Sequence, residues 1–190
     1  MKAWYFSTEE KKLRYDDNRD IKIGGTHEIQ GEPILCKHGL HGSVNILDAL
    51  DYASGPIVYR VELSGKMDIG IDKISAQKRT YLEGGVDISD VLREFTRWCA
   101  LQVINLWDAP DVVREYLETG KEELRDAAGA AARAAARDAA RDAAWAAAWA
   151  AAWDAAWAAT RDATRDADRD AQNKKIEEMV MEALNESMVF

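Results

Sequence analysis

The sequence predicts an α+β protein in which a small β-rich domain, mixed or antiparallel, precedes several helices and a long helical appendage rich in alanine and tryptophan. Three observations lead to this prediction. Short β-branched and aromatic segments bounded by glycine or proline fill residues 1–83. Apolar residues recur at helical spacing from Ser89 onward. An unbroken four-residue repeat then runs from Arg125 to Gln172.

These changes of pattern divide the 190-residue chain into four parts. The length suffices for one medium domain with an appendage, or for two small domains. The predicted parts are a β-rich domain at 1–85, core helices at 86–120, a repeat helix at 121–173 and an amphipathic C-terminal helix at 174–190.

Within the first part, the predicted strands are rich in β-branched and aromatic residues. They are Lys2–Ser7, the two arms of a glycine-centred hairpin in Ile21–Ile29, Ile57–Leu63 and Ile74–Leu82. Ser43 is a favourable N-cap for a helix over residues 44–53, which the Gly55-Pro56 pair ends.

Two further helices are predicted before the repeat. The first runs from Ser89 to Trp107 and is expected to be largely buried, because its apolar residues recur along one face. The second follows Pro110. The segment Thr119–Glu122 is typical of a capping box, in which the hydroxyl and the carboxylate satisfy backbone donors at the start of the next helix.

The third residue of each four-residue unit is alanine, which has the highest helix propensity, and no proline interrupts the repeat. The first positions include four tryptophans in a row, which we call the Trp ridge: Trp145, Trp149, Trp153 and Trp157. A four-residue step turns a helix by about 400°, so the ridge drifts by roughly 40° per repeat. This drift is opposite to that of a heptad seam, so we expect a steep, local contact rather than a long coiled coil.

Four exposed indoles in a row would form a hydrophobic surface patch that promotes aggregation, so we expect the Trp ridge to be buried. A second apolar stripe, the tail stripe, consists of Ile176, Met179, Val180 and Leu184 and also requires a docking surface. The covering surface is the rest of the chain, a second copy or a foreign partner. We interpret both sets as candidate interface residues and predict a homo-oligomer.

Composition argues against nucleic-acid binding, a signal peptide and a membrane span. The formal net charge of −9 argues against nucleic-acid binding, which needs a basic face. The N-terminal residues lack the apolar core of a signal peptide, and two cysteines fit a reduced cytoplasmic setting. The alanine-rich segment 143–159 contains Asp154 and is short, so no membrane span is expected.

One short segment contains several residues with ligand chemistry. Cys36, His38 and His41 lie within six residues and would provide three of the four ligands of a zinc site. Their spacing matches no common zinc knuckle. The favoured interpretation is therefore a loop whose histidines and cysteine pack against the sheet, with no metal.

Cys36–His41 reads C-x-x-G-L-H, and it is followed by Asn45–Ala53 and by the strand segment Val58–Gly65. In these three features the chain resembles an uncharacterised domain family of phages and bacteria, whose members are also followed by Ala/Arg/Trp/Asp repeats. The resemblance covers residues 1–83 and implies no assigned activity.

The segment Gly39–Ala53 is also similar to the strand–helix element of ADP-ribosyltransferase-like folds. That resemblance implies an NAD-dependent enzyme in which His41 or Tyr52 clamps nicotinamide and Glu83 orients the ribose. The first strand, however, lacks the His-Gly or Arg-Gly pair of such enzymes, and no Q/E-x-E motif surrounds Glu83.

From these features we expect a non-enzymatic, oligomeric binding or sequestration protein of phage or mobile-element origin. It would need no cofactor and would counteract a host defence by binding a host protein or a small ligand. The alternative is an ADP-ribosyltransferase-like enzyme that uses NAD.

The Trp ridge is testable by itself. Trp149→Ala should lower the melting temperature or dissociate the assembly, because removing a large buried ring typically costs roughly 3–5 kcal/mol. Arg137→Ala, at the same repeat position, should cost less than about 1 kcal/mol. Light scattering and thermal unfolding followed by circular dichroism distinguish the two variants. If Trp149→Ala melts like the parent protein and indole emission is that of free tryptophan, the ridge faces solvent.

Overall fold

The computed structural model describes residues 1–15, 17–150 and 158–187, with side chains described for all of these except 138–150 and 158–167. The chain forms two compact units. Met1–Val91 and Asn173–Phe190 form the first, which we call the sheet unit, and Leu92–Gln172 form the second, the helical unit.

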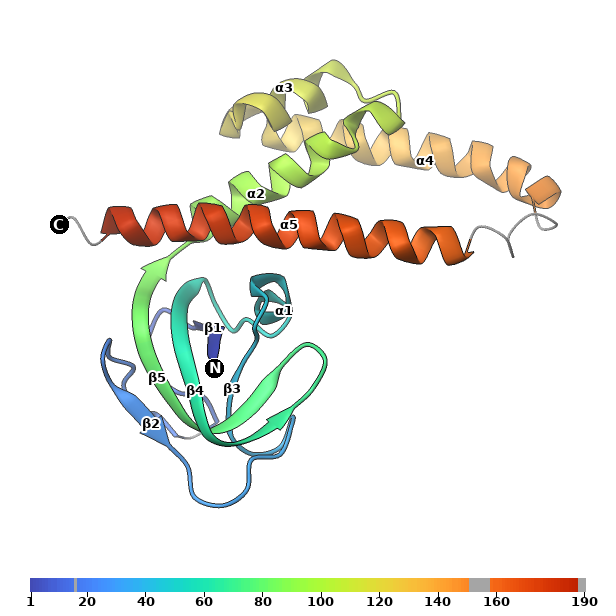
Figure 1. Cartoon of the computed structure of the whole chain (residues 1–190). Coiled ribbons are helices and arrows are strands. Elements are labelled where there is room, and N and C mark those ends of the chain that lie inside the picture. Colours follow the sequence, from blue (N-terminus) through green and yellow to red (C-terminus); the bar gives the residue numbers. More distant parts are fainter. Residues whose placement is uncertain (16, 151–157, 188–190) are drawn as a thin grey trace. The chain divides into compact units, whose positions relative to one another are not determined.

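The sheet unit is built on one antiparallel sheet, which confirms the predicted α+β class (Figure 1). The strands are β1 (Lys2–Ser7), β2 (Thr26–Glu28), β3 (Leu40–Gly42), β4 (Ile57–Ile69) and β5 (Ile74–Asp87). Their order is β1-β4-β5-β2, and β3 pairs with β5 as well. β2 and β3 therefore follow one another along the same edge of β5.

The sheet is rolled, and backbone hydrogen bonds join its two ends. The Trp4 N–H in β1 donates to the Ser43 carbonyl at 2.7 Å, and the Ser43 N–H donates back at 3.1 Å. Register shifts in the β4–β5 pair bend the long strands, as β-bulges do. At one shift Gly84 has φ +116°, and a Cβ there would lie 2.3 Å from the Val58 carbonyl oxygen. Inside the roll lies an apolar cluster that includes Tyr59, Val61, Leu63 and Tyr81.

The predictions of β1, β4 and β5 are correct in position, whereas β3 was not predicted. β1 has the predicted bounds, whereas β4 and β5 extend beyond Leu63 and Leu82. The extension of β4 is largely exposed and therefore lacks the apolar alternation on which the prediction rested. The predicted hairpin is wrong: Ile21 is a buried core residue outside any strand, and β2 pairs with β5 instead.

The first helix begins later than predicted. Helix α1 covers Ile46–Leu50 with Asn45 as its N-cap. Ser43 is not the cap because its backbone closes the sheet against Trp4, which fixes this residue in an extended segment.

The tail stripe is covered by the chain itself. Helix α5 (Ala158–Ser187) continues across the predicted boundary at 173/174, and its C-terminal part belongs to the sheet unit. The side chains of Ile176, Val180 and Leu184 are at most 1% exposed. The Leu47 N–H in α1 donates to the Asn173 Oδ1 at 3.1 Å. The tail stripe therefore needs no second copy to bury it, contrary to our assignment of these residues to an interface.

The helical unit contains most of α2 (Ser89–Gln102), η1 (Ile104–Leu106), α3 (Asp111–Thr119), η2 (Glu122–Leu124) and α4 (Arg125–Ala150). The expected burial of Ser89–Trp107 is wrong. Within α2 only Phe95 is fully buried, and Trp107 is 37% exposed. The helix ends at Gln102, after which a 3-10 turn directs the following apolar side chains differently.

Helix α3 packs against α4, where Val113 and Ala128 are buried. The alanines of the repeat permit this close approach. Gly120, with φ +66°, ends α3 in the left-handed conformation. Thr119 is the last residue of α3, where its hydroxyl donates to the Glu115 carbonyl at 2.6 Å and accepts from the Lys121 N–H at 3.3 Å. The hydroxyl thus bonds Lys121 rather than Glu122, and the Glu122 carboxylate pairs with Arg125 at 2.7 Å, so the reciprocal pair of a capping box does not form.

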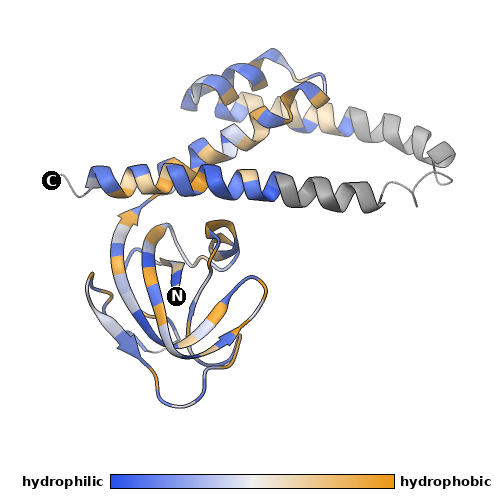
Figure 2. Ribbon diagram, in the orientation of Figure 1, coloured by the Kyte–Doolittle hydropathy of each residue, from blue (hydrophilic) through white to orange (hydrophobic). Residues whose placement is uncertain are grey.

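The repeat is helical wherever the structure describes it, as α4 and the first part of α5. In the coloured part of α4, hydrophobic and hydrophilic residues are interspersed (Figure 2). Trp145 and Trp149 belong to the α4 backbone, but their side chains lie outside the described residues, as do Trp153 and Trp157 entirely. Burial of the Trp ridge therefore stays a prediction. No described helix combines the length and apolarity needed to cross a bilayer.

The contribution of the tail stripe to the sheet unit is measurable. Leu184→Ala should destabilise the protein by roughly 2–5 kcal/mol, because Leu184 is 1% exposed and its truncation leaves a cavity. Glu178→Ala, on the exposed side of the same helix, should change stability little. Urea unfolding followed by circular dichroism gives both values. Equal midpoints for the two variants would show that the tail helix does not stabilise the protein.

Candidate functional site

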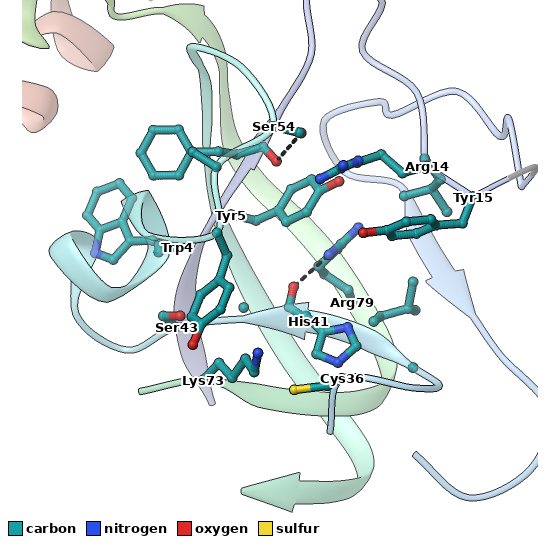
Figure 3. A pocket seen from close by; sticks show the side chains of 18 of the residues that line it. Trp4, Tyr5, Arg14, Tyr15, Cys36, His41, Ser43, Ser54, Lys73 and Arg79 are labelled. Atoms are coloured by element: carbon teal, nitrogen blue, oxygen red, sulfur yellow. Dashed lines mark hydrogen bonds between the residues drawn. The ribbon is translucent and has the colours of Figure 1, made fainter. Parts of the chain in front are cut away.

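One pocket of about 960 Å³ lies in the sheet unit (Figure 3). Its walls come from β1, β3 and Arg79 of β5, from the loops that contain Arg14 and Cys36, and from the end of α1 with the residues after it. This volume lies within the range of small-molecule sites in proteins. The pocket therefore has room for an organic ligand.

Arg79 is the main polar feature of this pocket. Its side chain is 2% exposed, and its Cζ lies 3.5 Å from the centroid of the Tyr5 ring. Its Nη1 donates to the His41 carbonyl oxygen at 2.6 Å, while Nε and Nη2 donate to the Tyr81 hydroxyl at 3.0 and 2.7 Å. A guanidinium carries five N–H groups, so donor capacity remains after these three bonds.

The groups around Arg79 are neutral. Burial raises the pKa of Tyr81 to about 12, despite the opposing effect of the Arg79 cation, so its phenol stays protonated at neutral pH. The Tyr81 hydroxyl also contacts Nδ1 of His27 at 3.0 Å, while Nε2 of His27 contacts the Asp20 carbonyl at 3.1 Å. Because a carbonyl only accepts, a neutral His27 donates from Nε2 and accepts the phenolic proton at Nδ1. The lone pairs of Tyr81 then face Arg79.

No carboxylate among the described residues pairs with the Arg79 guanidinium. Removing a cation from water costs several kcal/mol, whereas a desolvated cation–π contact returns about 2 kcal/mol. The hydrogen bonds to the neutral groups of Tyr81 and His41 offset part of the desolvation cost that the cation–π contact leaves. The arrangement is therefore electrostatically complementary to an anion inside the pocket.

His41 provides a polar atom that has no protein partner among the described residues. Its Nε2 is buried and unbonded within the part of the chain that the structure describes. Burial lowers the pKa of His41, and the nearby cations Lys73 and Arg79 lower it further, so the ring is neutral at neutral pH. A neutral imidazole can donate to or accept from a ligand according to its tautomer.

The segment before β3 is held tightly against β5. The Ser75 hydroxyl donates to the His38 carbonyl at 2.8 Å. Gly39 has φ +128°, and a Cβ at this position would lie 2.0 Å from the Ser75 Oγ. Only glycine fits here, and this fit places Cys36 and His41 on the pocket wall.

Further cations and aromatic rings line the pocket. The Lys73 ammonium lies 3.8 Å from the centroid of the half-exposed Tyr52 ring, and a contact with Cys36 is the main cause that raises the pKa of Lys73. At another part of the wall, the Arg14 guanidinium lies 4.9 Å from the centroid of the Tyr15 ring. Tyr15 is 87% exposed although it lines the pocket.

The structure brings together part of the predicted sites. His41 and Tyr52 line the pocket, but Glu83 does not, so the three residues suggested by the ADP-ribosyltransferase resemblance do not share it. The alternative zinc ligands Cys36, His38 and His41 all line the pocket. Nevertheless, no group of three or more His, Cys, Asp or Glu residues suited to a metal ion occurs among the described residues. His38 Nε2 instead contacts the Gln30 carbonyl at 2.8 Å.

Arg79, Tyr5 and Tyr81 were not among the residues predicted from the sequence to form a site. A usable signal is present, because Arg79 and Tyr81 are two residues apart on one strand and so face the same side. An arginine at a core-facing position of a strand indicates either a buried ion pair or an anion site.

Comparison with protein families gives one match. Residues 10–94 match the model of a family described as a domain of unknown function (DUF7666). This region covers most of the sheet unit, including the pocket residues from Leu13 to Arg79. It supports membership of this region in an uncharacterised domain family. Neither the curated proteins nor the solved structures contained a match.

The lowered pKa of His41 predicts acid sensitivity. Below pH about 6.5 the unfolded chain binds a proton at this residue before the folded chain does, so stability falls as the pH decreases towards the folded pKa. His27 acts in the same direction. His41→Asn should therefore lose less stability than the parent between about pH 7.5 and about pH 5.5, with the His27 contribution remaining. Urea unfolding at both pH values measures this, and NMR titration of the histidine rings identifies the residue. If the His41 ring titrates with the ordinary pKa of a histidine side chain, the prediction is wrong.

Proposed function

We propose that the sheet unit is a non-enzymatic binding module that holds a small organic anion against Arg79. The observation that carries this proposal is a guanidinium that is 2% exposed, lines a pocket and finds only neutral acceptors among the described residues. Its position is fixed by two strands and by the Tyr5 ring, so the cation is preorganised for a ligand. Lys73 and Arg14 add positive charge to the same pocket.

Sequestration is the role that we infer for such a module. A protein of phage or mobile-element origin that removes an anionic host molecule from solution would counteract a host defence. Assembly through the Trp ridge into a homo-oligomer in the cytoplasm belongs to this proposal as well. The tail stripe gives no support to assembly, because the chain itself buries it.

The NAD-dependent alternative has weaker support. His41 and Tyr52 line the pocket as that alternative requires, but the acid it needs, Glu83, does not. NAD is itself an anion with aromatic rings, so it serves as a probe for both candidates. Binding without nicotinamide release supports a binding module.

The role of Arg79 is tested with pyrophosphate as the probe. Pyrophosphate should raise the melting temperature of the parent protein, because a ligand that binds only the folded state stabilises it. In Arg79→Met this increase should disappear. Methionine has similar length and no charge, so it removes the desolvation cost of the cation, while the His41 carbonyl and the Tyr81 hydroxyl lose a donor at a cost of about 1–3 kcal/mol each. The melting temperature of the variant without pyrophosphate is therefore its reference.

Arg60→Met is the matched control. Arg60 belongs to the neighbouring strand β4 and also lies over an aromatic ring, 4.5 Å from the centroid of Trp4, but it does not line the pocket. It should respond to pyrophosphate like the parent at equal ionic strength. If Arg79→Met responds equally too, the proposed anion site is wrong. If the parent protein releases nicotinamide from NAD and the Glu83→Gln variant does not, the protein is an enzyme and the proposed binding module is wrong.

A further inference from the structure

We propose that the ligand of this pocket is a nucleoside phosphate, whose phosphate group binds Arg79 and whose base stacks on Tyr15. This inference deepens the proposed function and rests on the anion site at Arg79. It adds a second contact, made by an aromatic ring, and a chemical class for the ligand.

Tyr15 is placed as a stacking surface. Its ring is 87% exposed, and Figure 3 shows it pointing into the pocket towards Arg79. Most of the area of this ring is therefore free for a flat group. Base–aromatic stacking needs such a ring and tolerates every base, since each base has a π-face.

The backbone and the neighbouring cation at Tyr15 support this assignment. Tyr15 has φ +59°, a conformation that is unfavourable for a bulky residue and that is often retained at functional sites. The Arg14 guanidinium lies over the same ring at 4.9 Å. An arginine beside a stacked base also attracts the phosphate that the base carries.

The remaining polar groups distinguish a nucleoside phosphate from a simple aromatic acid. The pocket is also lined by Ser43, by Ser54, whose hydroxyl donates to the Phe6 carbonyl at 3.4 Å, and by His41, whose buried Nε2 has no partner in the described part of the chain. These neutral groups suit the hydroxyls of a sugar. The ligand should therefore contain an anion, a planar ring and neutral hydroxyls, and the volume of about 960 Å³ accommodates all three.

The free nucleotide is favoured over a nucleic acid chain. Arg79 is almost fully buried, so a phosphate must enter the pocket to reach it. The formal net charge of −9 opposes the approach of a polyanion, whereas a single nucleotide carries little charge.

The experiment compares AMP, ribose 5-phosphate and adenosine by calorimetry on the full-length protein. We expect AMP to bind more tightly than either fragment. Tyr15→Ala should weaken AMP binding by about 5- to 150-fold, the range expected for the loss of one stacking contact, and leave ribose 5-phosphate binding unchanged. Tyr15→Phe keeps the ring and should bind AMP like the parent. Because Tyr15 is exposed, neither substitution should disturb folding.

The outcomes separate this inference from the proposed function. If ribose 5-phosphate binds as tightly as AMP, or if Tyr15→Ala binds AMP like the parent, the nucleoside assignment is overturned while the anion site remains. If no phosphate compound binds the parent protein, both proposals are overturned. If a single-stranded oligonucleotide binds more tightly than AMP in a Tyr15-dependent manner, the ligand is a nucleic acid, and the free nucleotide assignment is wrong.

Discussion

The backbone pairing of Trp4 with Ser43 is the interaction on which the sheet unit depends. It joins β1 to the end of β3 and so closes the sheet. The other pairings between the described strands all involve β4 or β5. Without this closure, Tyr5 on β1 and His41 on β3 would lie at opposite edges of an open sheet. With it, both residues reach Arg79 on β5, where one supplies a ring and the other a carbonyl. The pocket is thus a consequence of sheet topology.

The closed sheet also explains why a cation can remain buried. Tyr81 holds Arg79 from one side and Tyr5 covers its face, and neither group can move without breaking the aromatic cluster that they form with Tyr59. Folding therefore places positive charge where solvation is poor before any ligand arrives. In such surroundings an added anion gains more than it would at the surface, because effective dielectric screening is weaker.

The sequence predicts the local elements of this fold well and its long-range contacts poorly. The bounds of β1, the core of β4 and the helical repeat follow from propensity and periodicity, which depend on near neighbours. Ser43 pairs with Trp4, which lies 39 positions earlier in the sequence. Because serine is also a favourable N-cap, the sequence alone wrongly predicted that Ser43 begins a helix. His41 and Tyr52 were recognised through a local motif, whereas Arg79 gains its meaning only when β1, β3 and β5 meet. The tail stripe was correctly recognised as buried, but its partner was not predictable from α5 alone.

The charge of the pocket also distinguishes binding from NAD cleavage. Breaking a glycosidic bond develops positive charge on the sugar, and enzymes stabilise it with a carboxylate placed beside the reacting carbon. Here the buried charge is Arg79, with Lys73 and Arg14 in the same lining. Two carboxylates also line the pocket: Asp17 is bound by Arg19 at 2.6 Å, and Asp51 is exposed. The proposed site would stabilise the phosphate group of a ligand in the ground state and oppose a cationic transition state. Tight binding without turnover is therefore what our proposal expects of this arrangement of residues.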